Sequence, residues 1–536
     1  MREHVMAHEG LPRSRELLLA VVSGACLVLA FPPIDFLPAA FIALVPLFYV
    51  IRNVKGGGFW SGFRPGFVAG IAFFLPLLYW LALLSSSQMD NPVVMSGPLF
   101  LLVLLQSFYW GLFSAVASFV GNRTRIPWFV VLPLLWVTFE QLRSLGVVGF
   151  TWGALGYAAV TVPRAIQFAS VTGLFGVSLW LALSNALVSE LASGGRRRMA
   201  PALALVVVLA LPALHGTMVL RDEAAAQAAA GENEARRTIR VAVIQPNISG
   251  ETKWDARYRE QSFEALGRLS LEAADRKPDL IVWPETAAPS YLLLMPEDLA
   301  RVGEMARAAN TPILTGCPHL MPTDAEEGAG RALNSAAVIG VDGVPSADTY
   351  SKIKLVPFGE VIPFETVIPA LADVDFGEAD FWPGSDRVVF ELPSGTFSTL
   401  ICYESTFPRL ARQFVAGGSE LLVNITNDVW YGRSSMPYQH ASMAIMRAIE
   451  NRRSLARSAN SGVSMLVDPF GRVVSRTEIF EEGFLVESMQ VRSEKTFYTR
   501  YGDVFPWGAS LAGGVMLLMG VSGGNGRGER RRVRGR

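Results

Sequence analysis

The chain has 536 residues, of which 51% are hydrophobic and only 18% charged, and its formal net charge is zero. Soluble globular proteins carry about 25% charged residues, so this composition indicates a membrane protein. Because no basic field accompanies the balanced charge, the sequence excludes the electrostatic pattern of a nucleic-acid-binding protein.

Eight apolar runs are candidates for membrane-spanning helices, each of which needs about 20 residues to cross the hydrocarbon core. Seven precede residue 222 and one lies near the C-terminus: 17–31, 36–51, 66–84, 98–120, 127–139, 166–188, 200–220 and 505–521. The second and fifth runs are short. The first could be a signal peptide, but it ends at Phe31-Pro32-Pro33, which lacks a small-residue cleavage pattern, so we expect it to be retained.

Positive charge marks every second loop of this membrane part. The N-terminus and the loops at 52–64, 123–125 and 196–198 carry Arg or Lys, whereas 85–92 carries neither. Since basic loops stay on the cytoplasmic side, we expect a cytoplasmic N-terminus, a non-cytoplasmic segment between the last two spans, and a cytoplasmic Arg-rich tail at 522–536. The tail could instead be a disordered solubilising segment without topological meaning.

The segment between the seventh and eighth spans has a different residue pattern. Residues 222–237 are rich in Ala, Glu and Arg and are expected to link the helical part, 1–221, to a domain at 238–495, while a return segment and the last span occupy 496–521. Short β-rich runs predict strands at 239–245, 280–284, 312–316, 335–341, 396–403, 421–426 and 463–468. Helices are predicted at 258–274, 297–309, 407–416 and 439–456. This alternation indicates an α/β domain whose sheet is largely buried.

The three cysteines differ in their surroundings. Cys26 lies within the first apolar run and Cys317 at the end of a predicted strand, where a free thiol behaves as a small apolar side chain. Cys402 ends an apolar run and precedes Tyr403-Glu404, which is the strand-end position of a nucleophile. A disulfide between Cys317 and Cys402 is the alternative in an oxidising compartment, but it would consume the one plausible reactive thiol.

A thiol nucleophile needs a base and a group that stabilises an oxyanion. None of the five histidines stands in a pattern typical of a Cys–His pair or a metal site, so the chemistry is expected to use a carboxylate and an amine. Glu285 follows the apolar run 280–284, and Lys352 stands in the stretch 350–360 (YSKIKLVPFGE). Each alone is typical of a surface charge, but together with Cys402 they predict an acyl-transfer site.

These residues resemble the nitrilase, or carbon–nitrogen hydrolase, superfamily, whose Glu-Lys-Cys triad occurs in this order. More closely, nearly the whole chain is similar to the bacterial apolipoprotein N-acyltransferase family, from Phe31-Pro32-Pro33 to 498–503. The most specific stretches are Trp283-Pro284-Glu285, 355–360 (LVPFGE) and Cys402-Tyr403-Glu404. The resemblance implies a membrane α-helical bundle, here of eight predicted spans, plus a nitrilase-like α/β domain with the layers of an α-β-β-α sandwich.

The resemblance also implies the role of each triad residue. Glu285 is the general base, Lys352 the cation that supports the tetrahedral intermediate, and Cys402 the nucleophile. Many soluble nitrilases carry His two residues after the triad Lys, where this chain has Lys354, and this departure changes the electrostatics around Lys352. No metal or organic cofactor is expected.

Four further residues are expected in or beside the site. By resemblance Glu360 and Glu404 are additional site carboxylates, Tyr403 supports the site, and Trp254 positions substrate. A core or surface-anchor role is the alternative for Trp254. With several carboxylates near one thiol, at least one is expected to be protonated or hydrogen-bonded to the backbone.

The family resemblance implies a two-step transfer. Cys402 takes a fatty acyl chain from a membrane phospholipid, chiefly phosphatidylethanolamine, and the α-amine of a lipoprotein's diacylglyceryl-cysteine then accepts it. The implied location is the bacterial inner membrane, with the catalytic domain in the periplasm. Two other classes stay open: a membrane-tethered amidase or nitrilase acting on a small extracellular substrate, and a non-enzymatic sensor or lipid-binding protein.

Apolar sequence beside the site predicts contact with lipid. Residues 287–295 and 361–382, each directly after a site carboxylate, are expected to form lipid-facing arms, and packing inside the domain is the alternative. Within the membrane part, Glu140 and Arg143 are candidates for a functional role, because polar residues are costly at membrane depth. Their spacing on a helix would equally suit a structural ion pair.

Overall fold

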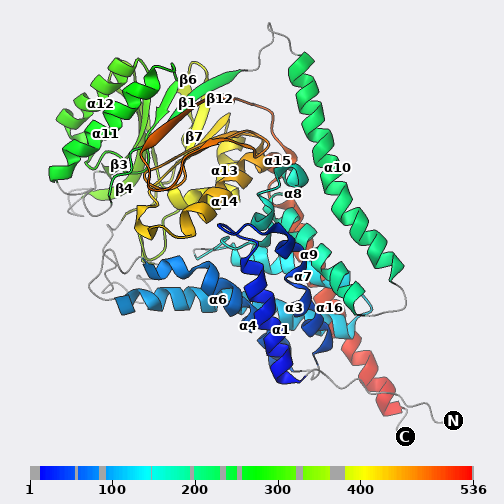
Figure 1. Cartoon of the computed structure of the whole chain (residues 1–536). Coiled ribbons are helices and arrows are strands. Elements are labelled where there is room, and N and C mark those ends of the chain that lie inside the picture. The colour runs from blue at the N-terminus through cyan, green and yellow to red at the C-terminus, as the bar shows by residue number, and fades with distance from the viewer. Residues whose placement is uncertain are drawn as a thin grey trace.

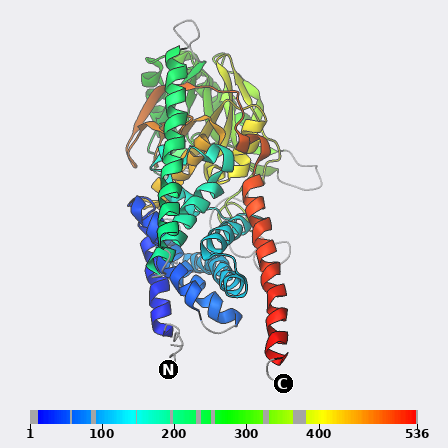
Figure 2. The same ribbon diagram turned by 90° about the vertical axis from the view of Figure 1, so that its right-hand side faces the viewer.

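The computed structural model of the chain describes residues 12–54, 58–83, 92–146, 148–193, 198–229, 237–249, 256–321, 330–362 and 381–533. A helical domain lies below an α/β domain (Figure 1). Seen from the side, α10 rises along one flank of both domains, and α16 descends from the α/β domain along the helical one (Figure 2). The α/β domain is therefore joined to the helical domain at both of its ends.

The helical domain is built from the apolar runs of the sequence. Its longer helices are α1 (Arg13–Val28), α4 (Phe59–Leu77), α6 (Pro92–Arg123), α7 (Trp128–Arg143), α9 (Leu174–Ala192), α10 (Met199–Ala229) and α16 (Val504–Val533). The predicted second span is divided into two short helices, α2 (Leu37–Ile42) and α3 (Val45–Asn53). α10 continues to Ala229, so the first part of the expected link is helical.

Among the described residues, four helices are long and apolar enough to cross a membrane: Gly97–Arg123, Leu174–Ala192, Met199–Ala226 and Val504–Ser522. The prediction of eight spans is thus confirmed only in its coarser form, a region of several apolar helices. α1 and α7 have 16 residues each. At 1.5 Å per residue they are about 24 Å long, which is short of a hydrocarbon core of about 30 Å.

Glycines on one face of α4 allow it to pack closely against α6. Gly62, Gly66 and Gly70 recur every four residues, so they form a stripe along the helix. A methyl group added at Gly70 would lie 2.7 Å from the Cα of Ser107, and one at Gly66 would collide with the carbonyl of Trp110. Small residues permit this backbone approach between membrane helices, where apolar side chains alone gain little over lipid.

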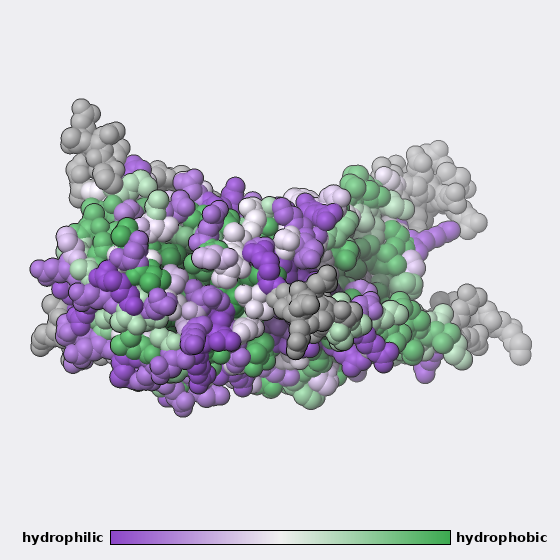
Figure 3. Space-filling model, turned by 90° about the horizontal axis from the view of Figure 1, so that it is seen from above, coloured by the Kyte–Doolittle hydropathy of each residue, from purple (hydrophilic) through white to green (hydrophobic). Residues whose placement is uncertain are grey.

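α10 exposes an apolar face. Leu203, Val206, Leu211, Leu214 and Met218 are all exposed. Viewed from above, hydrophobic residues gather on the side of the molecule where α10 lies, whereas hydrophilic residues cover much of the α/β domain (Figure 3). Such a surface is expected for a helix that faces lipid.

The α/β domain contains two six-stranded mixed sheets. The first, in the order β12-β1-β2-β3-β4-β5, consists of β1 (Thr238–Gln245), β2 (Leu280–Val282), β3 (Ile313–Met321), β4 (Arg331–Ile339), β5 (Pro345–Ser351) and β12 (Gly483–Gln490). The second, in the order β11-β10-β9-β8-β7-β6, consists of β6 (Phe390–Leu392), β7 (Gly395–Ile401), β8 (Leu421–Thr426), β9 (Ser454–Ala459), β10 (Met465–Val467) and β11 (Val473–Arg476). β1–β2–β3 and β7–β8–β9 are parallel, and the other neighbours are antiparallel.

The main helices of the domain are α11 (Ala256–Ala274), α12 (Pro296–Ala309), α13 (Pro408–Ala416) and α14 (Met436–Asn451). Between them, the side chains along β1 alternate between two hydrophobic cores. Ile239, Val241 and Val243 pack toward the second sheet, whereas Ala242 and Ile244 pack toward α11 and α12. α13 and α14 cover the other face of the second sheet, next to the helical domain (Figure 1). The layers therefore follow the order helix, sheet, sheet, helix, as the resemblance implied.

Each predicted strand and helix of this domain has a counterpart, but several boundaries are wrong. β3 ends at Met321 and not at 316, and β4 begins at Arg331 and not at 335. The helix predicted at 439–456 ends at Asn451, and residues from Ser454 form β9. The break follows from Arg452, whose φ of +52° is the left-handed conformation that commonly ends helices. Besides β9, strands β5, β6, β11 and β12 were not predicted. β5 is rich in polar residues and largely exposed, so it lacks the apolar pattern that marks a strand.

Candidate active site

Cys402 stands at the carboxyl end of β7, where the strand turns into the short helix Cys402–Thr406. We call residues 402–406 the nucleophile turn. The φ angle of Cys402 is +49°. This left-handed conformation costs a non-glycine residue roughly 1–3 kcal/mol and persists only when the surroundings hold it. The thiol is thus presented at a strand end, as predicted.

Glu285 and Lys352 reach the same place from the other sheet. Glu285 lies just beyond β2, and Lys352 follows β5 directly. The Lys352 ammonium, only 1% exposed, is 3.3 Å from Oε1 of Glu285 and 2.8 Å from Oε1 of Glu360. The charges of Glu285 and Lys352 both act on the Cys402 thiol. The structure therefore brings the three predicted triad residues together, with Glu360 beside them.

A buried amide joins the two carboxylates. Nδ2 of Asn334, in β4, donates to Oε1 of Glu285 at 2.8 Å and to Oε1 of Glu360 at 3.0 Å. The other oxygen of Glu285 accepts the backbone N–H of Asn427 at 2.9 Å. Glu285 is thereby oriented from both sheets. Asn334 was not predicted, because a lone Asn within a strand carries no specific sequence signal.

The electrostatics of the site require a base. Burial raises the pKa of the Cys402 thiol, the Glu285 carboxylate raises it further, and the Lys352 ammonium opposes them. The thiol is therefore protonated at neutral pH and must lose its proton during attack. Burial by itself lowers the pKa of Lys352, but the carboxylates of Glu360 and Glu285 raise it well above its usual value. Lys352 thus keeps a positive charge that can stabilise an oxyanion.

Glu404 holds the backbone around the nucleophile turn. Its carboxylate accepts the backbone N–H groups of Ile353, Lys354 and Ile401 at 2.7, 3.0 and 2.8 Å. The hydroxyl of Tyr350 donates to it at 2.8 Å. Burial raises the pKa of Glu404 to about 7, while the backbone donors and Tyr350 favour the ionised form. Glu404 thereby ties the end of β5 to the end of β7.

The sequence also singled out Tyr403, Cys317 and Trp254, and these three residues lie in different surroundings or outside the described residues. The ring of Tyr403 packs against Phe407, with centroids 4.9 Å apart, and against the core of the helical domain. Cys317 is a free, fully buried cysteine, and burial raises its pKa to about 12. The alternative of a disulfide between Cys317 and Cys402 is therefore wrong, because both thiols are free. Trp254 lies outside the described residues.

Three buried polar residues on the far side of the nucleophile turn were missed. Asp428 follows β8, His440 lies on α14 and Arg457 lies in β9. Nε2 of His440 is 3.0 Å from the carbonyl oxygen of Cys402, so a histidine contacts the backbone of the nucleophile although no sequence pattern pairs the two residues. The pair is separated by 38 residues, which no local motif can reveal. The one sequence signal for this buried polar group was that polar residues directly follow the buried strand β8.

Asp428, His440 and Cys402 also have the spacing of a metal site. A side-chain ligand atom from each lies within 4.8 Å of the others. However, Nη2 of Arg457 donates to Oδ2 of Asp428 at 2.8 Å. Although burial raises the pKa of Asp428, Arg457 and His440 lower it to about 2. The guanidinium already supplies the positive charge that a metal would bring, so the donor set favours an ion pair here.

The apolar arm predicted at 287–295 is mostly internal. Ala287, Ala288 and Leu292 are buried in the core between the first sheet and its helices. Only its end is accessible, with Leu294 53% and Met295 45% exposed. The prediction of a lipid-facing arm is therefore wrong for most of this run, since the apolar residues close the domain's own core. Of the second arm, 363–380 lies outside the described residues.

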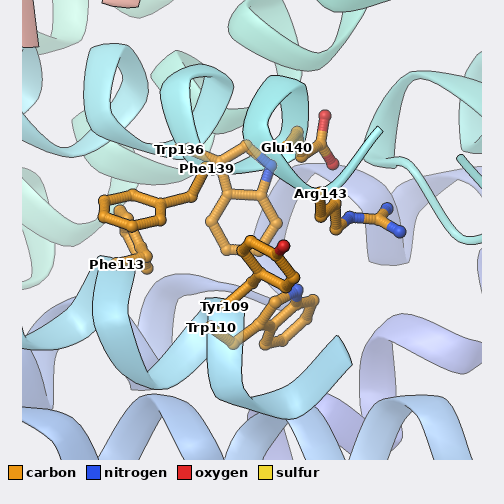
Figure 4. Close-up of a pocket in the computed structure, with 7 residues that line it drawn as sticks. All are labelled: Tyr109, Trp110, Phe113, Trp136, Phe139, Glu140 and Arg143. Atoms are coloured by element: carbon orange, nitrogen blue, oxygen red, sulfur yellow. The ribbon is translucent and has the colours of Figure 1, made fainter. Parts of the chain in front are cut away.

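Glu140 and Arg143, at the end of α7, line a small cavity together with aromatic residues of α6 and α7 (Figure 4). Within the described part of the chain they form no ion pair with each other, so that alternative is wrong. Nη1 of Arg143 donates to the carbonyls of Phe150 and Trp152, both at 2.9 Å, and Glu140 accepts the N–H of Leu155 at 2.7 Å. Both side chains therefore hold the loop that follows α7.

Two family models match the chain. Residues 23–187 match the apolipoprotein N-acyltransferase N-terminal domain, and residues 240–496 match the carbon-nitrogen hydrolase domain. An apolipoprotein N-acyltransferase from Geobacter metallireducens is 36% identical over 522 residues, covering 95% of each chain. One from Chlorobaculum tepidum is 32% identical and covers 94% of this chain and 96% of its own. One from Pseudomonas aeruginosa is 32% identical and covers 97% and 98%. With matches of this extent, the chain belongs to the apolipoprotein N-acyltransferase family.

Proposed function

We propose that this membrane enzyme moves a fatty acyl chain from a phospholipid to the N-terminal diacylglyceryl-cysteine of a lipoprotein, through a thioester on Cys402. The observation that carries the proposal is the buried meeting of Glu285, Lys352 and Cys402, within a chain that matches acyltransferases over nearly its full length. Phosphatidylethanolamine is the proposed donor. Trp254 is proposed to position substrate.

In the first half-reaction, Sγ of Cys402 attacks an ester carbonyl of the phospholipid while Glu285 takes the thiol proton. The carbonyl oxygen becomes negative and is stabilised by Lys352. The ester C–O bond then breaks, and the leaving lysophospholipid oxygen takes the proton from Glu285. The products are a thioester on Cys402 and a lysophospholipid.

In the second half-reaction, the α-amine of the lipoprotein attacks the thioester carbon. The same cation stabilises the second oxyanion, and Glu285 accepts a proton from the attacking amine. The C–S bond then breaks, and the thiol regains a proton as the amide is released. Glu360 and Asn334 hold Lys352 and Glu285 in place in both halves, because Glu360 accepts from Lys352 and Asn334 donates to Glu285.

The proposed domain arrangement places this chemistry outside the cytoplasm. It comprises a transmembrane domain (1–221), a link (222–237), a periplasmic catalytic domain (238–495), a last span (496–521) and a cytoplasmic tail (522–536). Eight spans in the inner membrane are proposed, with basic loops on the cytoplasmic side. The exposed apolar face of α10 supports the placement of that helix against lipid.

Reporter fusions test this topology. Alkaline phosphatase, which is active only outside the cytoplasm, should be active when fused near Asp222 or after Asp503 and inactive after Arg527. A fusion after Arg123 serves as an inactive internal control, because that loop is basic. An inactive Asp222 fusion with normal expression would overturn the proposed number of spans and the periplasmic placement together.

The transfer itself is tested by supplying the purified chain with phospholipid that carries a labelled acyl chain and with a diacylated lipopeptide. We expect label in an amide on the lipopeptide, together with lysophospholipid, and no product when the phospholipid is omitted. Hydrolysis of small amides without any labelled lipopeptide would instead support a membrane-tethered amidase.

A further inference from the structure

Helix α14 belongs to the cores of both domains. Met443 and Met446 pack within the core of the helical domain, whereas Ala444 and Ala448 pack within the core of the α/β domain. These two pairs fall on different faces of one helix. A rigid helix shared in this way transmits the position of one domain to the other.

The side chain of Gln439, on this helix, is fixed by the helical domain. Its Oε1 accepts the indole N–H of Trp152 at 2.7 Å and that of Trp80 at 3.2 Å. Its Nε2 donates to the carbonyls of Pro32 and Leu77, both at 3.3 Å. Three separate segments of the helical domain, at Pro32, 77–80 and Trp152, therefore determine where this buried amide lies.

The next residue, His440, contacts the nucleophile turn. Nε2 of His440 lies 3.0 Å from the carbonyl oxygen of Cys402, within hydrogen-bond distance. The other ring nitrogen, Nδ1, lies 3.1 Å from both Oδ1 of Asp428 and Nη2 of Arg457, so the ring is fixed on both sides. The hydroxyl of Ser405 donates to the same carbonyl at 3.1 Å. The side chains of His440 and Ser405 thus both contact the carbonyl of a residue whose backbone is left-handed.

A second connection runs through the loop 150–157, which we call the bracing loop. The hydroxyl of Thr151 donates at 2.7 Å to the carbonyl of Thr406, the last residue of the nucleophile turn. Trp152, one residue further, is a donor to Gln439. The two polar residues at the end of α7 hold the backbone of this loop. Contacts therefore run without a gap from the interior of the helical domain to the nucleophile.

We propose that the helical domain positions the nucleophile, because the bracing loop, Gln439 and His440 together hold Cys402 in its strained, reactive conformation. His440 and Gln439 are positioning residues that act through the backbone of Cys402. The buried residues Glu140 and Arg143 contribute to the same positioning of Cys402, because they fix the bracing loop. The inference rests on the proposed function, in which Cys402 is the nucleophile, and it adds that the membrane part belongs to the catalytic apparatus.

The rate at which iodoacetamide alkylates Cys402 in the intact detergent-solubilised chain, followed by intact mass, tests this inference. His440→Ala and Gln439→Ala should each slow alkylation about tenfold or more, since small misplacements of a reacting group carry large kinetic penalties. Acyl uptake from phospholipid should fall by a similar factor, with the KM for a lipopeptide nearly unchanged. Trp152→Phe removes the indole N–H that Gln439 accepts, together with part of the ring, and should slow alkylation in the same direction. This variant keeps the test open if His440→Ala does not fold.

Gln167→Ala is the matched control. Gln167 is also a fully buried glutamine that joins the domains, but its Nε2 donates to the carbonyl of Phe470 at 2.9 Å, away from the nucleophile turn. We expect its alkylation rate to stay within about twofold of wild type, because its side-chain amide donates to the carbonyls of Pro163 and Phe470 and not to the bracing loop or the nucleophile turn. Equal slowing by Gln167→Ala and Gln439→Ala, or wild-type rates in both Gln439→Ala and His440→Ala, would overturn the inference. A wild-type chain that is alkylated at Cys402 but takes no acyl chain would refute the proposed function and leave the inference standing.

Discussion

Replacement of Cys402 by Ala should abolish both acyl uptake from phospholipid and acyl transfer to a lipopeptide. Cys317, the other thiol of the α/β domain, is fully buried in the core between the first sheet and its helices and cannot replace Cys402, and covalent catalysis requires the nucleophile itself. The variant should keep its fold, because the turn is held by Glu404, His440 and Ser405 through backbone atoms. Transfer is measured with a phospholipid that carries a labelled acyl chain.

The matched control is Cys317→Ala, which removes the other thiol of the α/β domain and should leave transfer measurable. Cys402→Ser keeps the shape of the side chain and should also be inactive or nearly so, since a hydroxyl is a weaker nucleophile than a thiol at neutral pH. Appreciable transfer by Cys402→Ala would mean that no thioester forms at this residue.

Replacement of Glu285 by Gln should lower the rate of acyl uptake by about 10²-fold to 10⁴-fold, the usual contribution of a general base. The pH dependence should change as well. Because burial raises the pKa of the Cys402 thiol, a variant without the base can react only through the small thiolate fraction. Its rate should therefore rise about tenfold per pH unit toward alkaline pH, as the thiolate fraction does below the thiol pKa.

The measurement is acyl uptake between pH 6 and 9, with initial rates compared at equal amounts of folded enzyme. Glu420→Gln, which replaces a carboxylate paired with Arg237 away from the site, is the control and should follow wild type. A rate for Glu285→Gln near that of wild type at pH 7, or one that does not rise with pH, would exclude Glu285 as the base.

The triad could be predicted because the ends of buried strands can be recognised in the sequence. Glu285 and Cys402 each follow a short apolar run, which marks a buried strand, and the family motifs fixed their order with Lys352. The roles remain predictions, since the geometry alone shows only that the groups meet. Asn334 and His440 could not be predicted, because they join the site through pairings between distant strands and helices.

Two of the failures of prediction share a cause, because an apolar sequence does not show which residues it packs against. The run at 287–295 was expected to face lipid, yet Leu292 is buried in the domain's own core. The run at 36–51 was expected to be one span, yet it forms two short helices. The ion pair expected for Glu140 and Arg143 is replaced by bonds to the following loop, a backbone partner that helical spacing does not reveal.

The central claim, a thioester on Cys402, is tested most directly by the intact mass of the purified wild-type chain after incubation with phospholipid alone. The account predicts a mass increase of one fatty acyl group that maps to the peptide containing Cys402, is removed by hydroxylamine, and is discharged as an amide when a diacylated lipopeptide is added. An unmodified mass under conditions in which the lipopeptide nevertheless becomes acylated would contradict it.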